Sequence, residues 1–321
     1  MINSIPSLFD KDCDPLTLGD KAINCLLYAD DLILLSKSEK GLQNCLDRLD
    51  GHCKEIGMMI NISKTKIMVF NKAGKLNVNF TINEQRLEVG TEYKYLGIVF
   101  CPSGSFTKAK ENLYKRSLKA YFKHKKAILG INNPKLGKHL FDHTISPIIT
   151  YCSEVWGSFK STTINIDKMS LKAIFNHSII ENTQRKFSRY LLGLSKQCST
   201  DALSGELGWK PMYSSIILAV IKYWHRLENT ENSLLSNSFK EHQTLKLTNA
   251  DNIISTVQIM ITKLKISLPL TELKHLPSSA LNKLLKKSID VAIKTEWKQN
   301  INKDLKKKIR TYCQFKNKFR I

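Results

Sequence analysis

The chain has 321 residues, enough for one large domain or two or three small ones, and 42% of them are hydrophobic, so it can bury a core. Its 50 Lys and Arg against 28 Asp and Glu give a net charge of +22, which favours a polyanionic partner: nucleic acid first, an anionic membrane surface second. No apolar run reaches the ~20 residues of a membrane helix, and we expect no signal peptide. Eight cysteines without C-x-x-C spacing predict neither a zinc site nor a disulfide framework, so we expect an intracellular protein, cytoplasmic, nuclear or both.

The first hundred residues predict a small antiparallel sheet with one helix. Residues 22–36, AINCLLYADDLILLS, are apolar on both sides of a polar centre and predict two buried strands joined at residues 29–31. Residues 39–56 predict a helix that Gly57 ends. Its apolar face would carry Leu42, Cys45, Leu46, Leu49 and Cys53. Residues 58–70 predict another strand, and residues 76–100 hold three short strand candidates.

From residue 106 onward the pattern is helical almost throughout. Apolar spacing predicts helices over residues 106–129, 134–158, 167–194, 212–229, 250–266 and 279–320. Pro147 lies inside the second of these and should kink or split it. The polar stretch 230–249 is the best candidate for a linker. The expected fold class is therefore α+β, a small sheet with one helix followed by a long basic helical region.

The most informative motif is Tyr28-Ala29-Asp30-Asp31 at the predicted hairpin tip. Two adjacent carboxylates at the end of an apolar hairpin are costly to bring together, and a divalent cation removes that cost. A simple β-turn with Asp at its tip is the ordinary alternative. Common hairpin turns favour Asn-Gly or Asp-Gly, however, and this turn contains no glycine. A helix and a strand ending in a lysine-rich element follow it, which favours the metal-binding interpretation.

Several segments in order resemble the reverse transcriptases of non-LTR, LINE-like retrotransposons. CLLYADDLILLSKSEKGLQ resembles their C motif, GMMINISKTKIMVF their D motif and YKYLGIVF their E motif. LFDHTISPIITYCSEVWG, KFSRYLLGL and GELGWKPMYSSII resemble the thumb and post-thumb region of jockey-like elements. The resemblance covers essentially the whole chain. It implies a partial palm at residues 1–103, a helical thumb and post-thumb region at 104–230, and a basic helical C-terminal region, partly disordered in one reading, at 231–321.

The resemblance also implies an activity, RNA-directed DNA polymerisation, and residues that carry it. Asp30 and Asp31 would bind Mg²⁺ or Mn²⁺, two ions in the complete family site, which activate the primer hydroxyl and stabilise the leaving pyrophosphate. Lys64 would approach the nucleotide phosphates, whereas Lys66 is as readily a surface lysine. The implied primer grip consists of Tyr93, Tyr95, Leu96 and Gly97. The implied partners are an RNA template and a DNA primer, with no membrane and no small-molecule cofactor.

Two basic segments stand out against this background. Lys and Arg crowd the predicted helix at 106–129, in which Glu111 is the only acidic residue. This excess of positive charge favours contact with phosphates. Its candidate nucleic-acid-binding residues are Lys108, Lys110, Lys115, Arg116, Lys119, Lys123 and Lys126. Residues 281–321 hold thirteen Lys or Arg and three Asp or Glu. This block is equally well explained as a contact for template RNA or as a disordered tail.

The palm of the family also has an A motif and a B motif, and the segments that match begin after both. Four early aspartates, Asp10, Asp12, Asp14 and Asp20, lack the apolar strand that an A motif requires, and we interpret them as solvated turn residues. We therefore expect a C-terminal part of a reverse transcriptase that is inactive alone. The alternative is a non-catalytic, basic nucleic-acid-binding protein derived from a retrotransposon.

Overall fold

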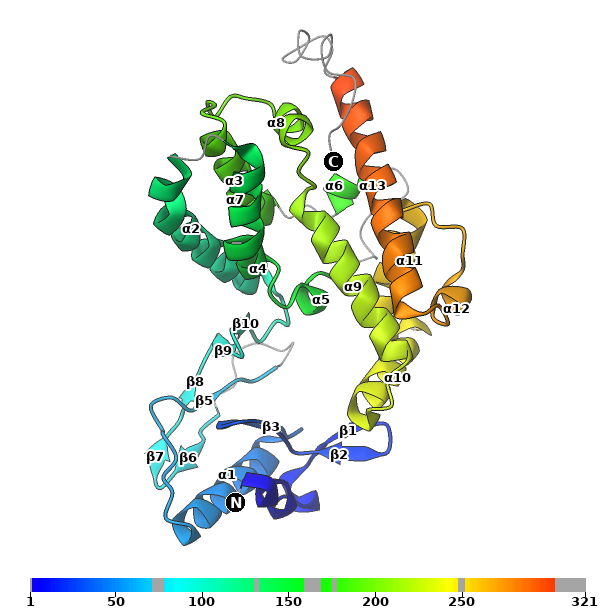
Figure 1. Ribbon diagram of the computed structural model, residues 1–321. Helices are drawn as coiled ribbons and strands as arrows, with labels where there is room; N and C mark the ends of the chain where they lie inside the picture. The colour runs from blue at the N-terminus through cyan, green and yellow to red at the C-terminus, as the bar shows by residue number, and fades with distance from the viewer. Residues whose placement is uncertain are drawn as a thin grey trace. The chain divides into compact units, whose positions relative to one another are not determined.

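The computed structural model describes residues 2–70, 78–129, 133–158, 169–174, 178–247 and 252–303. The chain forms two compact units, Met1–Lys108 and Ala109–Ile321 (Figure 1). The division falls in the first turn of helix α2 (Thr107–Leu129), close to the expected boundary after residue 103. The second unit takes in both regions that the sequence separates at residue 230. Within the described ranges, no helix is long and apolar enough to cross a membrane.

The first unit contains short strands arranged in pairs around one long helix. Its 3-10 helices are η1 (Ile2–Leu8) and η2 (Lys11–Cys13), and its α-helix is α1 (Glu39–Glu55). Its strands are β1 (Leu16–Leu18), β2 (Lys21–Ile23), β3 (Cys25–Tyr28), β4 (Asp31–Leu34), β5 (Lys66–Ile67), β6 (Thr81–Ile82), β7 (Gln85–Arg86), β8 (Glu88–Val89), β9 (Tyr93–Tyr95) and β10 (Ile98–Phe100). The described strands pair as β1–β2, β3–β4, β6–β7 and β9–β10, all antiparallel, and as β5–β8, which is parallel.

Helix α1 confirms the helix predicted over residues 39–56. The side chain of Ser38 accepts a hydrogen bond from the backbone N–H of Gly41 at 3.1 Å and caps the helix, while Gly57 follows the helix end with a φ of +70°. The apolar face is buried as expected. Leu46 packs in a cluster with Ile67, Val78, Phe80, Ile82 and Leu87. Cys45 packs with Phe9 and Cys13 in a second cluster. Helix α1 therefore supplies the surface on which the strands of this unit pack.

The continuous strand predicted over residues 58–70 is wrong. Residues 62–64 form a turn, because the side chain of Asn61 accepts the backbone N–H of Lys64 at 3.2 Å and offers the chain an alternative to a strand. Only Lys66–Ile67 is extended and paired. Lys64 and Lys66 therefore do not share one face of a strand. The strands at residues 25–34 are half-buried rather than buried, and five short strands replace the three expected between residues 76 and 100.

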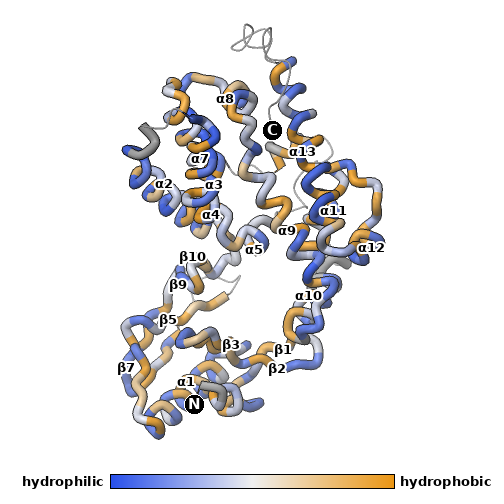
Figure 2. The backbone as a smooth tube through the Cα atoms, viewed as in Figure 1, coloured by the Kyte–Doolittle hydropathy of each residue, from blue (hydrophilic) through white to orange (hydrophobic). Residues whose placement is uncertain are grey.

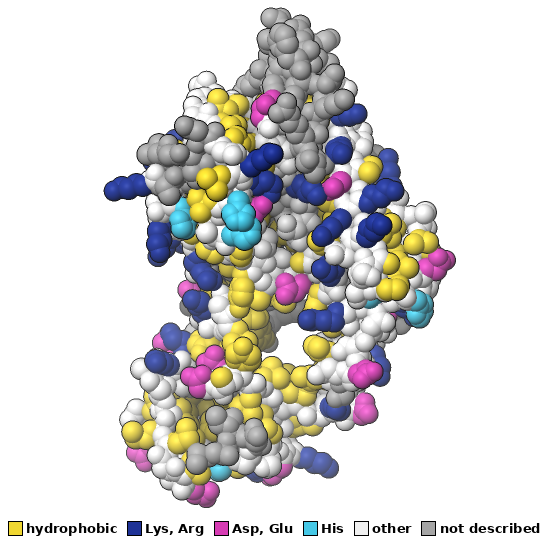
Figure 3. Space-filling view, in the orientation of Figure 1, with side chains coloured by type: hydrophobic (Ala, Val, Ile, Leu, Met, Phe, Trp, Pro, Cys, Tyr) yellow, Lys and Arg dark blue, Asp and Glu magenta, His cyan; other side chains and the backbone are white. Residues whose placement is uncertain are grey.

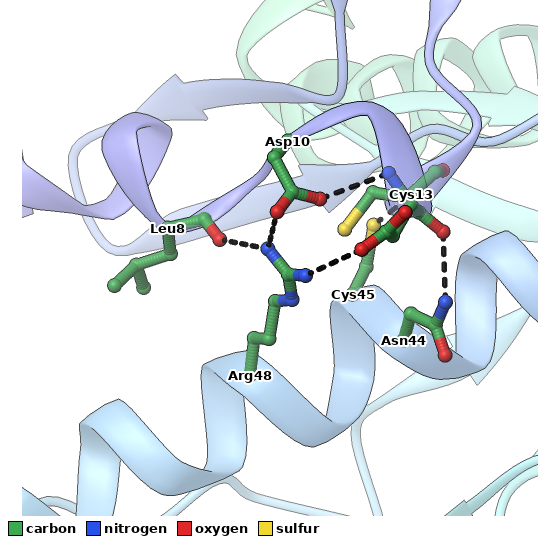
Figure 4. A network of polar contacts seen from close by, with 7 residues as sticks. Leu8, Asp10, Cys13, Asn44, Cys45 and Arg48 are labelled. Carbon is green, nitrogen blue, oxygen red and sulfur yellow. Dashed lines mark hydrogen bonds and ion pairs between the residues drawn. The ribbon is translucent and has the colours of Figure 1, made fainter.

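Asp10, Asp12 and Asp20 are exposed, in line with solvated turn residues, and Asp10 and Asp12 also contact α1. Figure 4 shows Arg48 of α1 reaching the segment that holds them. The Arg48 guanidinium lies 2.7 Å from Asp10 and 3.5 Å from Asp12, and it donates to the carbonyl of Leu8 at 3.0 Å. The hydrogen bond from Arg48 lowers the pKa of Asp10 below its usual value. Asn44 of α1 also donates to the carbonyl of Asp12 at 2.7 Å. These contacts fix the start of the chain on α1.

The second unit is helical throughout its described part. Its remaining helices are α3 (Pro134–Thr144), α4 (Ser146–Ile149), α5 (Ser153–Trp156), α6 (Leu171–Ile174), α7 (Ser178–Leu191), α8 (Thr200–Leu207), α9 (Met212–Glu228), α10 (Ser233–Leu247), α11 (Ile253–Lys263), α12 (Leu270–Leu273) and α13 (Ser278–Lys303). Pro147 stands at the start of α4 and splits the helix predicted over residues 134–158, as expected. Of the helix predicted over residues 279–320, the part after Lys303 lies outside the described residues.

The linker predicted at residues 230–249 is wrong, because α10 occupies most of it. Phe239 is 4% exposed, and α10 packs against α9 and α11. The burial of Phe239 and the packing of α10 against two helices outweigh the polar composition of the segment. Helix α9 is the centre of this unit and contacts α5, α7, α10, α11 and α13. Figure 2 shows hydrophobic and hydrophilic residues alternating along α7 and α13, as expected for helices with one buried face.

The three segments that resemble a thumb and post-thumb region meet in one aromatic cluster. The ring of Phe141 on α3 lies 5.1 Å from that of Phe187 on α7 and stacks on Trp209 at 5.5 Å between centroids. All four tryptophans are at most 5% exposed. The aromatic residues of these three segments therefore hold their helices together.

The packing of α1 makes a prediction about two of its glycines. A Cβ on Gly41 would lie 2.8 Å from the backbone oxygen of Cys13, whereas a Cβ on Gly51 would meet nothing within 4 Å. We expect Gly41→Ala to lower the free energy of unfolding by about 1–3 kcal/mol through overpacking. Gly51→Ala, in the same helix, should raise it by about 1 kcal/mol through helix propensity. Urea denaturation of both variants checks the pair, and equal effects would contradict the close approach of Cys13 to α1.

Candidate functional site

The hairpin β3–β4 presents the two candidate metal-binding carboxylates. Tyr28 pairs with Asp31, so the turn consists of Ala29 and Asp30. Ala29 has a φ of +53°, in the left-handed region that glycine ordinarily fills. For an L-residue this conformation costs about 1–2 kcal/mol. Strain of this kind is concentrated at functional sites, and the observed outlier is therefore a reason to examine the tip for function.

Both carboxylates are exposed and available. In the described part of the chain, neither Asp30 nor Asp31 forms an ion pair or a side-chain hydrogen bond. Side chains alternate along a strand, so Asp31 lies on the opposite face of β4 from Leu34, which packs against the cores beside α1. The core side of the hairpin is thus fixed, and the side that carries Asp31 stays accessible.

The hairpin β9–β10, the candidate primer grip, is near enough to Asp31 for its charge to act on Tyr95. Burial raises the pKa of Tyr95 above its usual value, and the nearby negative charge of Asp31 raises it further. Leu96 and Gly97 form the two-residue turn with φ values of +43° and +84°, the signs of a type I′ turn. Tyr93 is 37% exposed. The structure therefore brings the segments of the predicted C and E motifs together within one unit.

The structure gives Lys64 and Lys66 different surroundings. Lys64 is exposed in the turn at residues 62–64, and within the described residues its side chain forms no ion pair or hydrogen bond. Lys66 forms an ion pair with Glu88 at 2.9 Å, between the paired strands β5 and β8. That contact explains Lys66 as a surface residue, while a role for Lys64 stays a prediction.

The described residues offer a partial metal site. They contain no group of three or more His, Cys, Asp or Glu that could hold a metal ion. The paired carboxylates at residues 30 and 31 nevertheless supply the oxygen ligands that hard divalent cations prefer. The donor chemistry fits Mg²⁺ or Mn²⁺, with too few protein ligands among the described residues for tight binding.

Helix α2 has one buried face, and most of its candidate cations lie on the exposed face. The buried residues Leu113, Ser117 and Tyr121 recur every four positions, and Ser117 hydrogen-bonds Thr183 of α7 at 2.8 Å. Five cations are exposed and, in the part of the chain that the structure describes, form no ion pair: Lys115, Arg116, Lys119, Lys123 and Lys126. At 3.6 residues per turn they fall within an arc of about 100°. The structure therefore gathers these five into one basic stripe, the α2 stripe.

Two predicted members lie apart from the α2 stripe. Lys108 forms an ion pair with Glu92 at 2.7 Å. Lys110 is half-buried with its ammonium 5.6 Å from the ring centre of Trp156, and burial lowers its pKa. Phe122, an aromatic residue of the same helix, is 60% exposed and lies about 20° outside the arc of the stripe.

Comparison with known proteins finds a family match within the first unit. Residues 1–100 match the family described as reverse transcriptase (RNA-dependent DNA polymerase). The chain is 28% identical over 143 residues to an uncharacterized transposon-derived protein of Caenorhabditis elegans, covering 44% of this chain and 51% of that protein.

Two longer relatives are Pol polyproteins described as retrovirus-related and from the type-1 retrotransposable element R2. The one from Nasonia vitripennis is 30% identical over 93 residues, covering 26% of this chain and 9% of the polyprotein. The one from Bradysia coprophila is 29% identical over 97 residues, covering 27% and 11%. The matches thus span about half of the nematode protein and about a tenth of each polyprotein. No solved structure matches the chain. Over its first 100 residues, the chain is similar to the reverse transcriptase family.

Proposed function

We propose that the chain derives from the reverse transcriptase of a non-LTR retrotransposon and binds nucleic acid beside a partial nucleotidyl-transfer site. The observation that carries the proposal is the hairpin tip, where two exposed carboxylates without ion pairs in the described residues follow a strained alanine. The neighbouring Tyr95 and the family match over residues 1–100 support it. The jockey-like subtype and the assignment of the helices to a thumb remain predictions.

Each part of the proposed site has its own task. Asp30 and Asp31 hold the divalent cation, which when bound lowers the pKa of the primer hydroxyl and neutralises developing charge on the phosphates. The turn at Leu96 and Gly97 exposes its backbone for close approach of the primer strand. The α2 stripe neutralises phosphates, and Phe122 contacts a sugar or base beside it.

The alternative function is nucleic-acid binding without catalysis. It is favoured by the lack, among the described residues, of any group of three metal-binding side chains. Positioning two metals and a nucleotide requires more ligands than one carboxylate pair. We therefore propose that this 321-residue chain by itself binds Mn²⁺ weakly and does not complete the two-metal site.

The metal proposal predicts paramagnetic broadening at the hairpin tip. Titration of Mn²⁺ into the full chain should broaden the backbone NMR signals of Asp30 and Asp31 first and that of Tyr95 next. Asp30→Asn and Asp31→Asn should each reduce the broadening, because each removes one charged oxygen ligand. Asp20→Asn removes another exposed carboxylate and should leave it unchanged. Broadening that ignores both tip variants would exclude this pair as the metal ligands.

The α2 stripe predicts salt-dependent binding of a primer–template hybrid. Replacing Lys115, Arg116 and Lys119 by Glu should lower affinity for all sequences alike and flatten the log–log dependence on salt by roughly 0.9 for each phosphate that is no longer neutralised. Fluorescence anisotropy between about 50 and 200 mM salt measures this. The matched control replaces Lys11, Lys40 and Lys240, which are exposed elsewhere, and changes the net charge equally. Equal effects in both variants would show a general charge effect and remove the α2 stripe from the site.

A further inference from the structure

Helix α13 carries a second basic surface that the proposed function does not use. Its buried side chains recur every four residues: Leu281, Leu285, Ile289, Ile293, Trp297 and Ile301, each at most 5% exposed. The helix packs against α8 and α9. Residues 278–303 are therefore a packed helix, and the interpretation of the basic block as a disordered tail does not apply to them.

The charges of α13 are sorted by sign. Its acids face its neighbours: Asp290 lies 2.5 Å from Lys210, and Glu296 accepts a hydrogen bond from the hydroxyl of Tyr213 on α9 at 2.9 Å. Five of its lysines are exposed and, within the described residues, form no ion pair: Lys283, Lys286, Lys287, Lys294 and Lys298. Figure 3 shows Lys and Arg side chains gathered over α13. The exposed surface of the helix thus carries charge of one sign.

These lysines form a straight row. At 3.6 residues per turn, Lys283, Lys287, Lys294 and Lys298 fall within an arc of about 60°, and Lys286 flanks them. From Lys283 to Lys298 the row is about 22 Å long at 1.5 Å per residue. We call these five residues the α13 row. Asp290 and Glu296 contact residues outside the helix, so they do not neutralise the charge of the row. The row therefore favours a polyanion that extends along it.

We propose that the α13 row binds the phosphate backbone of a double-stranded nucleic acid, as a contact separate from the α2 stripe. Single strands are held largely by stacking on exposed aromatic rings, and in its described residues α13 exposes none, since Trp297 is 5% exposed and donates to the carbonyl of Asp201 at 2.8 Å. A membrane surface helix requires an exposed apolar face, whereas Val291 is the single large hydrophobic side chain that α13 exposes in its described part. A sequence-independent contact with duplex phosphates fits both facts.

The test compares charge-reversed variants of the full chain. Replacing Lys287, Lys294 and Lys298 by Glu should lower affinity for a short DNA duplex and for the RNA–DNA hybrid of the same sequence about tenfold or more near 50 mM salt, and should flatten the salt slope by roughly 0.9 for each phosphate that the row no longer neutralises. Lys→Arg at the same three positions should retain binding. The control at Lys11, Lys40 and Lys240, with the same change in net charge, should be affected much less. Circular dichroism verifies that each variant is folded.

The outcomes separate this inference from the proposed function. If charge reversal in the α13 row and charge reversal in the α2 stripe each weaken duplex binding, the result supports both this inference and the proposed function. Unchanged duplex binding in the α13 variant overturns the inference whatever the α2 variant does. Two other results also overturn it: an effect confined to single strands, or an effect confined to vesicles of phosphatidylcholine and phosphatidylserine. If only the α13 variant affects duplex binding, the inference stands and the role of the α2 stripe fails.

Discussion

The first unit depends on the burial of one face of α1. Its described strands occur in pairs that share no continuous ladder, so hydrogen bonding between strands cannot hold the unit together. Leu46 and Cys45 instead join two clusters that reach from Phe9 near the start of the chain to Leu87. Leu34 packs against both clusters and thereby fixes the hairpin that ends in the carboxylate pair. The accessibility of Asp31 follows from this anchoring, because the opposite side of its strand is committed to the core.

Local patterns predicted the elements whose signals are short-range. The apolar spacing in residues 39–56 with Gly57 after it, the break at Pro147, and the strand–turn–strand of residues 25–34 all appear as expected. Features that depend on a particular side-chain contact, local or distant, were missed. Asn61 diverts a predicted strand into a turn, Arg48 recruits two aspartates, and Phe239 turns a polar stretch into a packed helix. Each is decided by a contact that composition and periodicity do not contain.

The candidate site was likewise predicted only in part from the sequence. Sequence identified the carboxylate pair and the hairpin of Tyr95, and the structure adds that the charge of Asp31 acts on that tyrosine. Sequence also identified the basic helices but could not sort their cations. Packing places Lys110 over Trp156 and leaves Lys115 in the exposed stripe, although both belong to one charge run. On α13, packing turns the acids inward and the lysines outward. A charge count predicts the sign of the partner's charge. Which charged side chains of a helix can contact that partner depends on which face of the helix is buried.

We propose that this chain presents part of a polymerase site, with a carboxylate pair near a candidate primer-grip hairpin and without the ligands for a complete two-metal centre among the described residues. The most direct measurement is a primer-extension assay with the full 321-residue chain, an RNA template, a DNA primer and Mg²⁺ or Mn²⁺, run beside Asp30→Asn. The account predicts that the chain binds the hybrid and adds no nucleotide, because one pair of carboxylates cannot position two metals. Template-directed extension that disappears in Asp30→Asn would contradict it and would show that the chain supplies the missing ligands itself.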